Sequence, residues 1–263
     1  MAVKKKVKPR KKKAKKRINK EDQLTRRVAI SALLIAIVGI TAFLFYKNYF
    51  REPQKFESSK YIVKGIDISH HQPIINWEMV SEQDIYFGYI KATESVDHLD
   101  RNYIYNYEQA REAQVKIGSY HFFRFGVSGR DQAQHFIRTA KCQSGDMIPA
   151  IDVEHSTINT YSDDASYIAM IKHELMELES ALYEHYGVRP LIYTNKDCYK
   201  LYIKGSFPDN PFWICDLHKE PSDDINWRIW QFSHSGKLPG VDEKIDLNYY
   251  RYSFDEFKEL LLP

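Results

Sequence analysis

Two carboxylates that follow a short apolar run are the residues of this chain best suited to do chemistry. Asp152 and Glu154 come directly after the run 147–151, and residues at positions i and i+2 of a strand point to the same face. Two carboxylates on one face repel each other, so one of them holds its proton more readily. Glycoside hydrolysis uses such a pair: one acid protonates the leaving oxygen, and the other carboxylate supports the charge that develops on the sugar.

Other acidic residues stand where further strands are expected to end. They are Asp67, Asp216 and Asp246. Such carboxylates could instead cap helices or hold magnesium or calcium, and the sequence leaves these alternatives open. The chain has no glycine-rich phosphate loop and no Gly-x-Ser-x-Gly elbow, which argues against a nucleotide-binding loop and a serine hydrolase.

Eight short runs rich in Val, Ile, Tyr and Phe predict the strands that would position these acids. The runs are 65–69, 85–92, 116–123, 147–154, 190–194, 212–217, 228–232 and 245–248. Segments with helical periodicity lie between several of them, at 101–114, 129–141, 164–186 and 195–202. This alternation predicts an α/β fold, an irregular, TIM-like β/α barrel with its reactive residues at the C-terminal ends of the strands.

The last strands are too close together in the sequence for helical connections. We expect loops between them and at least one antiparallel pair, because parallel neighbours need a crossover of a dozen residues or so. After them, Ser253 and Glu256 have the spacing of a helix capping box. Phe254, Phe257, Leu260 and Leu261 would form the packing stripe of that final helix.

Charge is divided unevenly along the 263 residues. Residues 1–27 hold 14 Lys and Arg against 2 acids, a net charge of +12, whereas residues 28–263 hold 24 against 33, a net charge of −9. The two parts sum to the formal net charge of +3. Because the larger part is acidic, we expect no nucleic-acid partner for it.

A stretch without any charged residue follows the basic tail. Residues 28–46 would form about 28 Å of helix at about 1.5 Å per residue, enough to cross the hydrocarbon core of a membrane. We therefore predict a basic cytoplasmic tail at 1–27, a transmembrane signal anchor at 28–46, a linker at 47–61 and a catalytic domain at 62–263.

The excess of Lys and Arg before this stretch predicts its orientation. The positive-inside bias places the tail in the cytoplasm and the catalytic domain outside the cytoplasmic membrane of a bacterium, in a single-pass arrangement. A buried core helix and a cleaved signal peptide are the alternatives, although residues 43–46 lack the small residues that a signal peptidase needs. The tail either only fixes this orientation or also binds anionic lipid or nucleic acid.

Cysteine and histidine usage points away from disulfide and zinc scaffolds. Cys142, Cys198 and Cys215 are an odd number, so at least one thiol is unpaired, while a bridge from Cys198 to either of the others stays open. The ten His residues show no structural-zinc spacing. We expect a monomer without metal or cofactor.

Five ordered motifs resemble one enzyme family. They are Gly65-Ile-Asp67-Ile-Ser69-His-His-Gln72, Lys91-Ala-Thr-Glu94, Gly118-Ser-Tyr120-His121-Phe122, Pro149-Ala-Ile-Asp152-Val-Glu154, and Trp230-Gln231-Phe232 followed by Asp246-Leu-Asn248. In order and spacing they resemble glycoside hydrolase family 25, the N-acetylmuramidases of the bacterial and phage lysozyme type, over residues 62–260. The resemblance implies an irregular β/α barrel that cleaves the β-1,4 bond between N-acetylmuramic acid and N-acetylglucosamine in peptidoglycan.

The resemblance also implies roles for single residues. Glu154 is expected to be the general acid, and Asp152 either a nucleophile or the residue that orients the 2-acetamido group of the substrate. Asp67 and Asp246 match two further acids that line the cleft of the family. The candidates for sugar binding are Tyr120, Tyr193, Trp213, Trp230, Gln231 and Asn248.

Two departures from the usual pattern of the family leave the proposed acids untouched. Ser95 stands where a glycine commonly follows the Lys-Ala-Thr-Glu motif, and Cys215 stands where alanine is common. Two other classes of function stay open at this stage. One is a wall-binding module without activity, and the other is a membrane-tethered adaptor that acts through its basic tail.

Overall fold

The computed structural model describes residues 20–49 and 55–263, and the side chains of residues 23–44 and 55–263. The chain divides into two units, Met1–Glu52 and Pro53–Pro263, each of which is described by itself. Residues 1–19 of the expected cytoplasmic tail and residues 50–54 of the expected linker lie outside the described residues.

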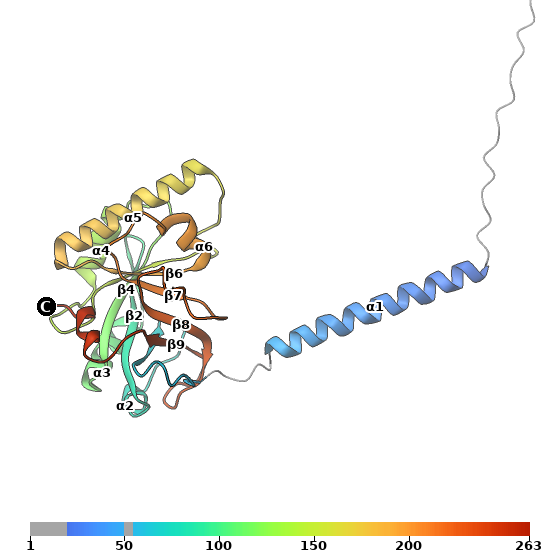
Figure 1. Cartoon of the computed structure of the whole chain (residues 1–263), viewed down its shortest axis with the longest axis horizontal. Coiled ribbons are helices and arrows are strands. Elements are labelled where there is room, and N and C mark those ends of the chain that lie inside the picture. Colours follow the sequence, from blue (N-terminus) through green and yellow to red (C-terminus); the bar gives the residue numbers. More distant parts are fainter. Residues whose placement is uncertain (1–19, 50–54) are drawn as a thin grey trace, which may run out of the picture. The chain divides into compact units, whose positions relative to one another are not determined.

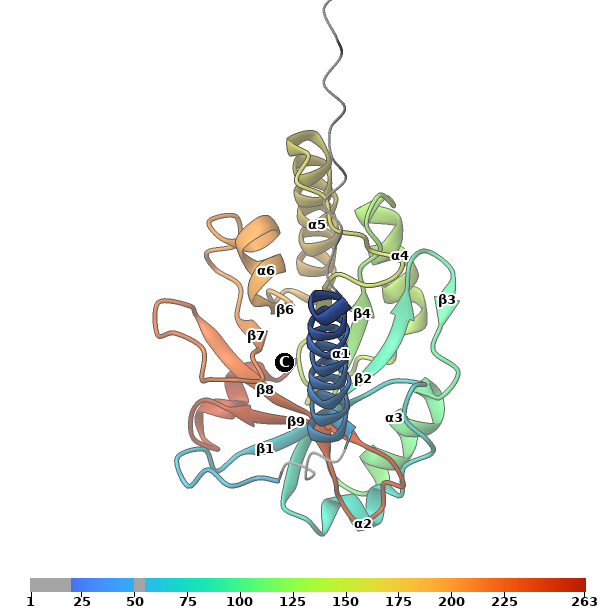
Figure 2. The same ribbon diagram turned by 90° about the vertical axis from the view of Figure 1, so that its right-hand side faces the viewer.

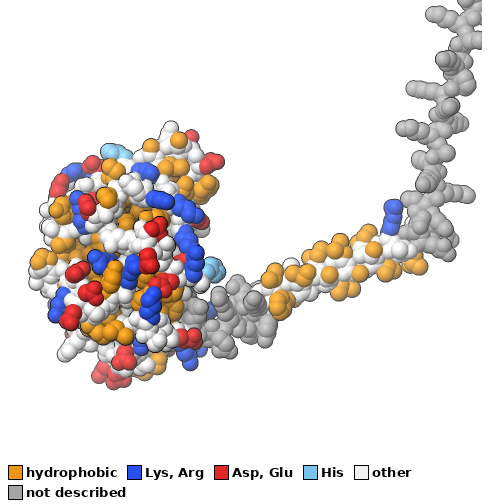
Figure 3. Space-filling model, in the orientation of Figure 1, with side chains coloured by type: hydrophobic (Ala, Val, Ile, Leu, Met, Phe, Trp, Pro, Cys, Tyr) orange, Lys and Arg blue, Asp and Glu red, His pale blue; other side chains and the backbone are white. Residues whose placement is uncertain are grey.

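Helix α1 (Lys20–Tyr49) belongs to the first unit. Within it, Gln23–Leu44 is long and apolar enough to cross a membrane, and none of it is buried. Hydrophobic side chains cover most of the surface that Figure 3 shows for this helix. A continuous apolar surface of this kind is unfavourable in water and calls for an apolar partner or a bilayer.

The second unit is a closed barrel of eight strands (Figure 1). The strands of the ring are β1 (Lys64–Ile68), β2 (Ile85–Glu94), β4 (Lys116–Phe122), β5 (Ala150–Val153), β6 (Leu191–Asn195), β7 (Phe212–Cys215), β8 (Trp227–Gly236) and β9 (Ile245–Tyr250). Their order is β1-β9-β8-β7-β6-β5-β4-β2, and pairing of β1 with β2 closes the ring. This confirms the eight predicted strands and the barrel.

Two features of the strands make the barrel irregular. Strand β9 runs antiparallel to both of its neighbours, β1 and β8, whereas the other neighbours in the ring are parallel. Only a loop joins β8 to β9, so the expectation of a loop-connected antiparallel pair is confirmed. A two-residue strand, β3 (His98–Leu99), pairs with the end of β2 outside the ring and was too short to be predicted from periodicity.

Helices cover part of the outside of the barrel. They are α2 (Trp77–Ser81), α3 (Tyr103–Glu112), α4 (Gly129–Thr139), α5 (Ala165–Tyr186), α6 (Lys196–Cys198) and the π-helical turn η1 (Tyr199–Ile203). The amphipathic pattern predicts α5 well: Asp164 caps its start through a 2.8 Å bond from Tyr167 N, and Gly187 ends it with φ +71°. Short α2 was not predicted.

The apolar core has two layers. One lies between the strands and the helices, and the other fills the barrel interior. The 3-10 helix η2 (Glu256–Leu260) closes the interior at the end away from the carboxylates, where Phe257 and Leu260 are buried. Ser253 and Glu256 make the reciprocal bonds of the predicted capping box, although the helix that follows is 3-10 and not α-helical.

Strands β8 and β9 lie side by side in the barrel (Figure 2), and their outer wall carries the aromatic side chains of Trp230, Phe232 and Tyr249. Residues 55–63, here called the covering segment, lie against it. Phe56 contacts Phe232 and Tyr249 at ring-centroid distances of 5.7 and 5.4 Å, and Ser58 N donates to the Tyr249 hydroxyl at 3.0 Å. Part of the expected linker is therefore an integral part of the barrel.

Candidate active site

Nearly all of the acids and aromatic residues singled out in the sequence meet in one cleft at the carboxyl ends of the parallel strands. The cleft has a volume of about 200 Å³. Of the ten candidate residues it is lined by Asp67, Asp152, Glu154, Asp246, Tyr120, Tyr193, Trp213 and Gln231. Eight positions spread over 180 residues of sequence thus face one another because the barrel closes.

Asp152 and Glu154 enter the cleft from β5. Asp152 is the third residue of the strand and is buried, whereas Glu154 follows the strand and is half-buried. Burial raises the pKa of Glu154 to about 7, and the charge of Asp67 adds to this effect. Burial and then the charge of Glu154 raise the pKa of Asp152 as well. Both carboxyl groups therefore hold a proton more readily than free side chains do.

One oxygen of Asp152 has no partner. Its Oδ1 is buried and accepts no hydrogen bond from any residue of the described part of the chain. A buried acceptor left unpaired costs free energy, typically about 1–3 kcal/mol. Such an atom in a polar cleft is suited to accept a hydrogen bond from a ligand.

Asp67 and Asp246 face each other across the β1–β9 ladder. They are hydrogen-bonded to each other, and burial raises the pKa of Asp67 to about 6. The pKa of Asp246 rises further, to about 9, because burial is joined by repulsion from Asp67 and Glu154. Asp246 was expected at the end of a parallel strand. It is in fact the second residue of the antiparallel β9, which brings it to the same end of the barrel from the opposite direction.

A buried cation stands near the acids. Lys91 of β2 is 5% exposed and lies 2.8 Å from Glu94, which in turn lies 3.2 Å from Arg124. The charge of Lys91 lowers the pKa of both Asp152 and Glu154, against the larger effect of burial. The Lys-Ala-Thr-Glu motif thus supplies a paired positive charge beside the carboxylates.

The two side-chain amides expected to bind sugar make hydrogen bonds to other side chains of the protein. Gln231 and Asn248 are 1% and 0% exposed, and both donate to Asp67 Oδ2, at 2.8 and 2.7 Å. Their oxygens accept bonds from Tyr193 and Trp213, each at 2.8 Å. One N–H of each amide is thus placed to orient Asp67.

The aromatic candidates divide into two sets. Tyr120, Tyr193 and Trp213 line the cleft, and Trp213 is almost fully buried at its base, where it stacks on Tyr89 at 4.9 Å. Trp230 does not reach the cleft. It points to the other face of β8, beside the covering segment, and donates to the Asp216 carbonyl oxygen at 2.8 Å.

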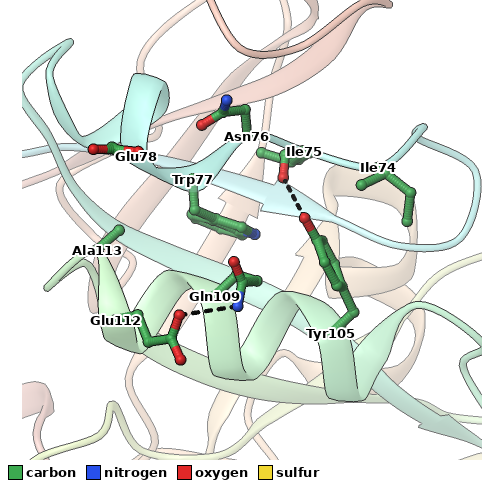
Figure 4. Close-up of a pocket in the computed structure, with 9 residues that line it drawn as sticks. All are labelled: Ile74, Ile75, Asn76, Trp77, Glu78, Tyr105, Gln109, Glu112 and Ala113. Carbon is green, nitrogen blue, oxygen red and sulfur yellow. Dashed lines mark hydrogen bonds between the residues drawn. The ribbon is translucent and has the colours of Figure 1, made fainter.

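A larger hollow lies elsewhere, between α2 and α3, with a volume of about 450 Å³ (Figure 4). Its side chains are largely satisfied among themselves: Gln109 donates to Glu112 at 3.0 Å, and the Tyr105 hydroxyl donates to the Ile75 carbonyl at 3.4 Å. The two acids there, Glu78 and Glu112, are exposed to water. The hollow is larger than the cleft but lacks its buried, mutually repelling carboxylates.

The model of the glycosyl hydrolases family 25 matches residues 66–241 of the chain. The chain belongs to this family. It is accordingly a glycosidase, and the barrel described above is the fold expected from the resemblance.

Relatives of known structure and curated relatives support the same family assignment. A family 25 glycosyl hydrolase from Bacillus anthracis is 31% identical, with a TM-score of 0.72, and the alignment covers 80% of this chain and 97% of that one. A bacterial lysozyme from Streptomyces coelicolor is 26% identical with a TM-score of 0.69, covering 76% and 96%. Lysozyme M1 of Streptomyces globisporus is 30% identical over 206 residues, covering 73% of this chain and 68% of that protein.

Four further residues line the cleft of this family 25 member and were not singled out as site residues. They are Ser69, His71, Gln72 and His234. The first three lie in the Gly65–Gln72 motif, so their place in that motif was the available signal. His234 could not be found in this way, because register shifts in the pairing of β8 with β9 decide where it points.

Neither Asp216 nor any of the three cysteines lines the cleft. Asp216 accepts bonds from the backbone of His218 and Lys219 and pairs with Lys196 at 2.5 Å. Cys142, Cys198 and Cys215 are all free thiols. Among the residues that the structure describes, no group of three or more His, Cys, Asp or Glu side chains is arranged to hold a metal ion.

Proposed function

We propose that residues 62–263 hydrolyse the β-1,4 bond between N-acetylmuramic acid and N-acetylglucosamine in peptidoglycan. The observation that carries this proposal is the pair Asp152 and Glu154, a buried and a half-buried carboxyl group that face one cleft of a family 25 glycosidase and whose pKa values burial raises. The two relatives named above as lysozymes support the substrate class.

Glu154 acts as the general acid. Its pKa of about 7 keeps a large share of the side chain protonated at neutral pH, as an acid that protonates a glycosidic oxygen requires. Burial is the main cause of this value, and substrate binding removes still more water from the cleft. The proton then moves from Glu154 to the leaving oxygen as the glycosidic bond breaks.

Asp152 orients the acetamido group of the muramic acid residue. Its unpartnered Oδ1 can accept a hydrogen bond from the acetamido N–H, which directs the acetamido oxygen at the anomeric carbon. Attack by that oxygen forms an oxazolinium ion, which water opens to give retained configuration. The alternative, direct attack by Asp152, would produce a covalent glycosyl-enzyme.

The first test replaces Glu154. We expect Glu154→Gln to reduce cleavage by about 10³-fold or more while the fold is kept, because the proton donor is lost and the shape is not. The measurement is mass spectrometry of reduced muropeptides released from peptidoglycan, which marks new muramic acid reducing ends. Glu108→Gln, at an exposed acid of α3, is the matched control. Near-normal release by Glu154→Gln would contradict the assignment.

A second test separates the two roles of Asp152. We expect Asp152→Asn to lose about 10²-fold or more in turnover. We also expect a thiazoline analogue of the oxazolinium ion to inhibit the wild-type protein competitively. Capture of a glycosyl group covalently bound to Asp152 by a slow fluorinated substrate would contradict orientation and favour direct attack.

We further propose that α1 anchors the protein in the bacterial cytoplasmic membrane, with the N-terminal tail inside and the barrel outside. The length and hydropathy of Gln23–Leu44 and the basic residues before it support this topology. An anchored hydrolase acts on glycan strands near the membrane. We retain the proposal of a monomer without a cofactor or a nucleic-acid partner.

A further inference from the structure

Asp67 is the centre of a hydrogen-bond network that the cleavage mechanism above does not use. Both Gln231 Nε2 and Asn248 Nδ2 donate to its Oδ2, at 2.8 and 2.7 Å, and both amides are buried. Two N–H donors on a single carboxylate oxygen favour the ionised form and fix its orientation.

The Trp213 indole settles which way the Asn248 amide faces. The Trp213 indole N–H can only donate, and it lies 2.8 Å from Asn248 Oδ1, so the Nδ2 of that amide must face Asp67. The Tyr193 hydroxyl donates to Gln231 Oε1 at 2.8 Å, and His234 Nε2 lies 2.9 Å from the same oxygen. The two amides that donate to Asp67 are thus themselves hydrogen-bonded to neighbouring side chains.

The remaining partner of Asp67 is Asp246, directly opposite on β9. Two carboxyl groups form a hydrogen bond only when one of them carries a proton. Because Asp67 already accepts two N–H bonds, the proton belongs to Asp246, and burial raises the pKa of that residue to about 9.

The charge of Asp67 reaches the reaction centre. Burial is the largest cause of the raised pKa of Glu154, about 7, and the charge of Asp67 is the second cause. The titratable groups that share this cleft region with Asp67 are Lys91 of β2, Tyr120 of β4, Asp152 and Glu154 of β5, Tyr193 of β6, Cys215 of β7, His234 of β8, Asp246 of β9 and His71, which follows β1. Burial lowers the pKa of both His71 and His234. The positive charge of Lys91 opposes the effect of Asp67 on Glu154.

We propose that Gln231 and Asn248 are positioning residues that hold Asp67 as the ionised member of the Asp67–Asp246 pair, and that the anion fixed in this way keeps the proton on Glu154. The part of this inference that concerns Glu154 rests on the proposed function. The part that concerns Asp67 stands on the hydrogen-bond geometry alone.

The first arm of the test needs no activity. The full chain in detergent is unfolded by heat between pH 5 and pH 8 as wild type, Gln231→Met and Asn248→Leu. Without one amide donor, Asp67 keeps its proton to a higher pH. The native state of the variant then binds more protons than its unfolded state over a wider pH range. The free energy of unfolding of the variant should therefore fall more steeply than that of wild type as pH rises. We expect the difference in Tm from wild type to widen between pH 6 and pH 8.

Asn210→Leu is the matched control. Asn210 is also a buried amide that donates to a carboxylate, Glu179 at 3.0 Å, but it does not line the cleft. Its loss should lower Tm by an amount that hardly changes with pH. The same pH-independent loss in Gln231→Met and Asn248→Leu would overturn the inference, and Gln231→Met alone decides the matter if Asn248→Leu does not fold.

The second arm measures glycan cleavage against pH. In Gln231→Met the fall in turnover at alkaline pH should move to lower pH by about half a unit, because a neutral Asp67 no longer supports the proton on Glu154. If the alkaline fall in turnover stays at the same pH while the Tm difference widens, the proposed effect of Asp67 on Glu154 is overturned. Absence of any cleavage by wild type would refute the proposed function and leave the unfolding arm to decide the state of Asp67.

Discussion

Four carboxyl groups within one small cleft cannot all be ionised at neutral pH, and the structure divides their protons. Asp67 is surrounded by N–H donors, while Asp246 faces it and has a pKa of about 9. Burial raises the pKa of both Asp152 and Glu154. Only Glu154, half-buried at the end of its strand, combines a pKa near 7 with access to a substrate.

This division predicts the pH dependence of catalysis. Because the general acid must be protonated, turnover should fall as pH rises through about 7, the pKa of Glu154. The free energy of unfolding should fall over the same range. Carboxyl groups with raised pKa values favour the folded state at low pH, and that contribution is lost as pH rises towards the folded-state values. A pH profile of muropeptide release, flat from pH 5 to pH 9, would contradict the role of Glu154.

Sequence reasoning at this scale succeeds where chemistry follows from local spacing. The i, i+2 spacing places Asp152 and Glu154 on one face, and the structure puts both in the cleft. It could not predict that Gln231 and Asn248 bind Asp67, because that partner is more than 160 residues away in the sequence. Trp230 was expected at the cleft, but its neighbour Gln231 takes the inward face of the strand, so Trp230 faces outward.

The strands and long helices could be foreseen because each buries a continuous apolar stripe. Ile171, Leu175, Leu178 and Leu182 of α5 repeat at helical spacing, and all are fully buried. The short elements α2 and β3 could not be foreseen, since five and two residues give too little periodicity. The antiparallel pairing of β9 with β1 could not be foreseen either, because it depends on closure of the whole ring.

Close packing of α4 on α5 makes Gly129 a sensitive position. A Cβ added there would lie 1.8 Å from the carbonyl oxygen of Glu174, so backbone must move. We expect Gly129→Ala to lower the free energy of unfolding by about 1–3 kcal/mol, measured by denaturant titration. Gly187→Ala is the comparison: its methyl would meet no atom within 4 Å, and only its φ of +71° should cost about 1 kcal/mol. Equal stability of Gly129→Ala and wild type would contradict this packing.

At the scale of the whole molecule, an exposed apolar helix and a separate, well-packed barrel have different requirements. The side chains of Gln23–Leu44 are all exposed within their unit, whereas the barrel buries its own core. Of the two units, the helix is therefore the one that calls for an apolar partner or a bilayer. The sequence alone indicated this division through the uncharged stretch 28–46 and the change of net charge.

Fractionation tests the anchor. We expect the full chain to stay in the membrane pellet after a high-salt wash, because salt weakens charge attraction but not burial of an apolar helix. Residues 20–263, which lack most of the basic tail, should behave in the same way, and residues 55–263 should be soluble. Release of residues 20–263 by salt would show that α1 does not anchor the protein in the membrane.

The covering segment also bears on what proteolysis would release. Because Phe56 and Ser58 already contact the outer wall, a cut between residues 50 and 54 would free the barrel with its aromatic wall still covered. A cut after Tyr61 would instead expose Phe232 and Tyr249 and invite aggregation. If α1 is the proposed anchor, one gene product would in this way yield both a tethered hydrolase and a stable shed form, according to where a protease acts.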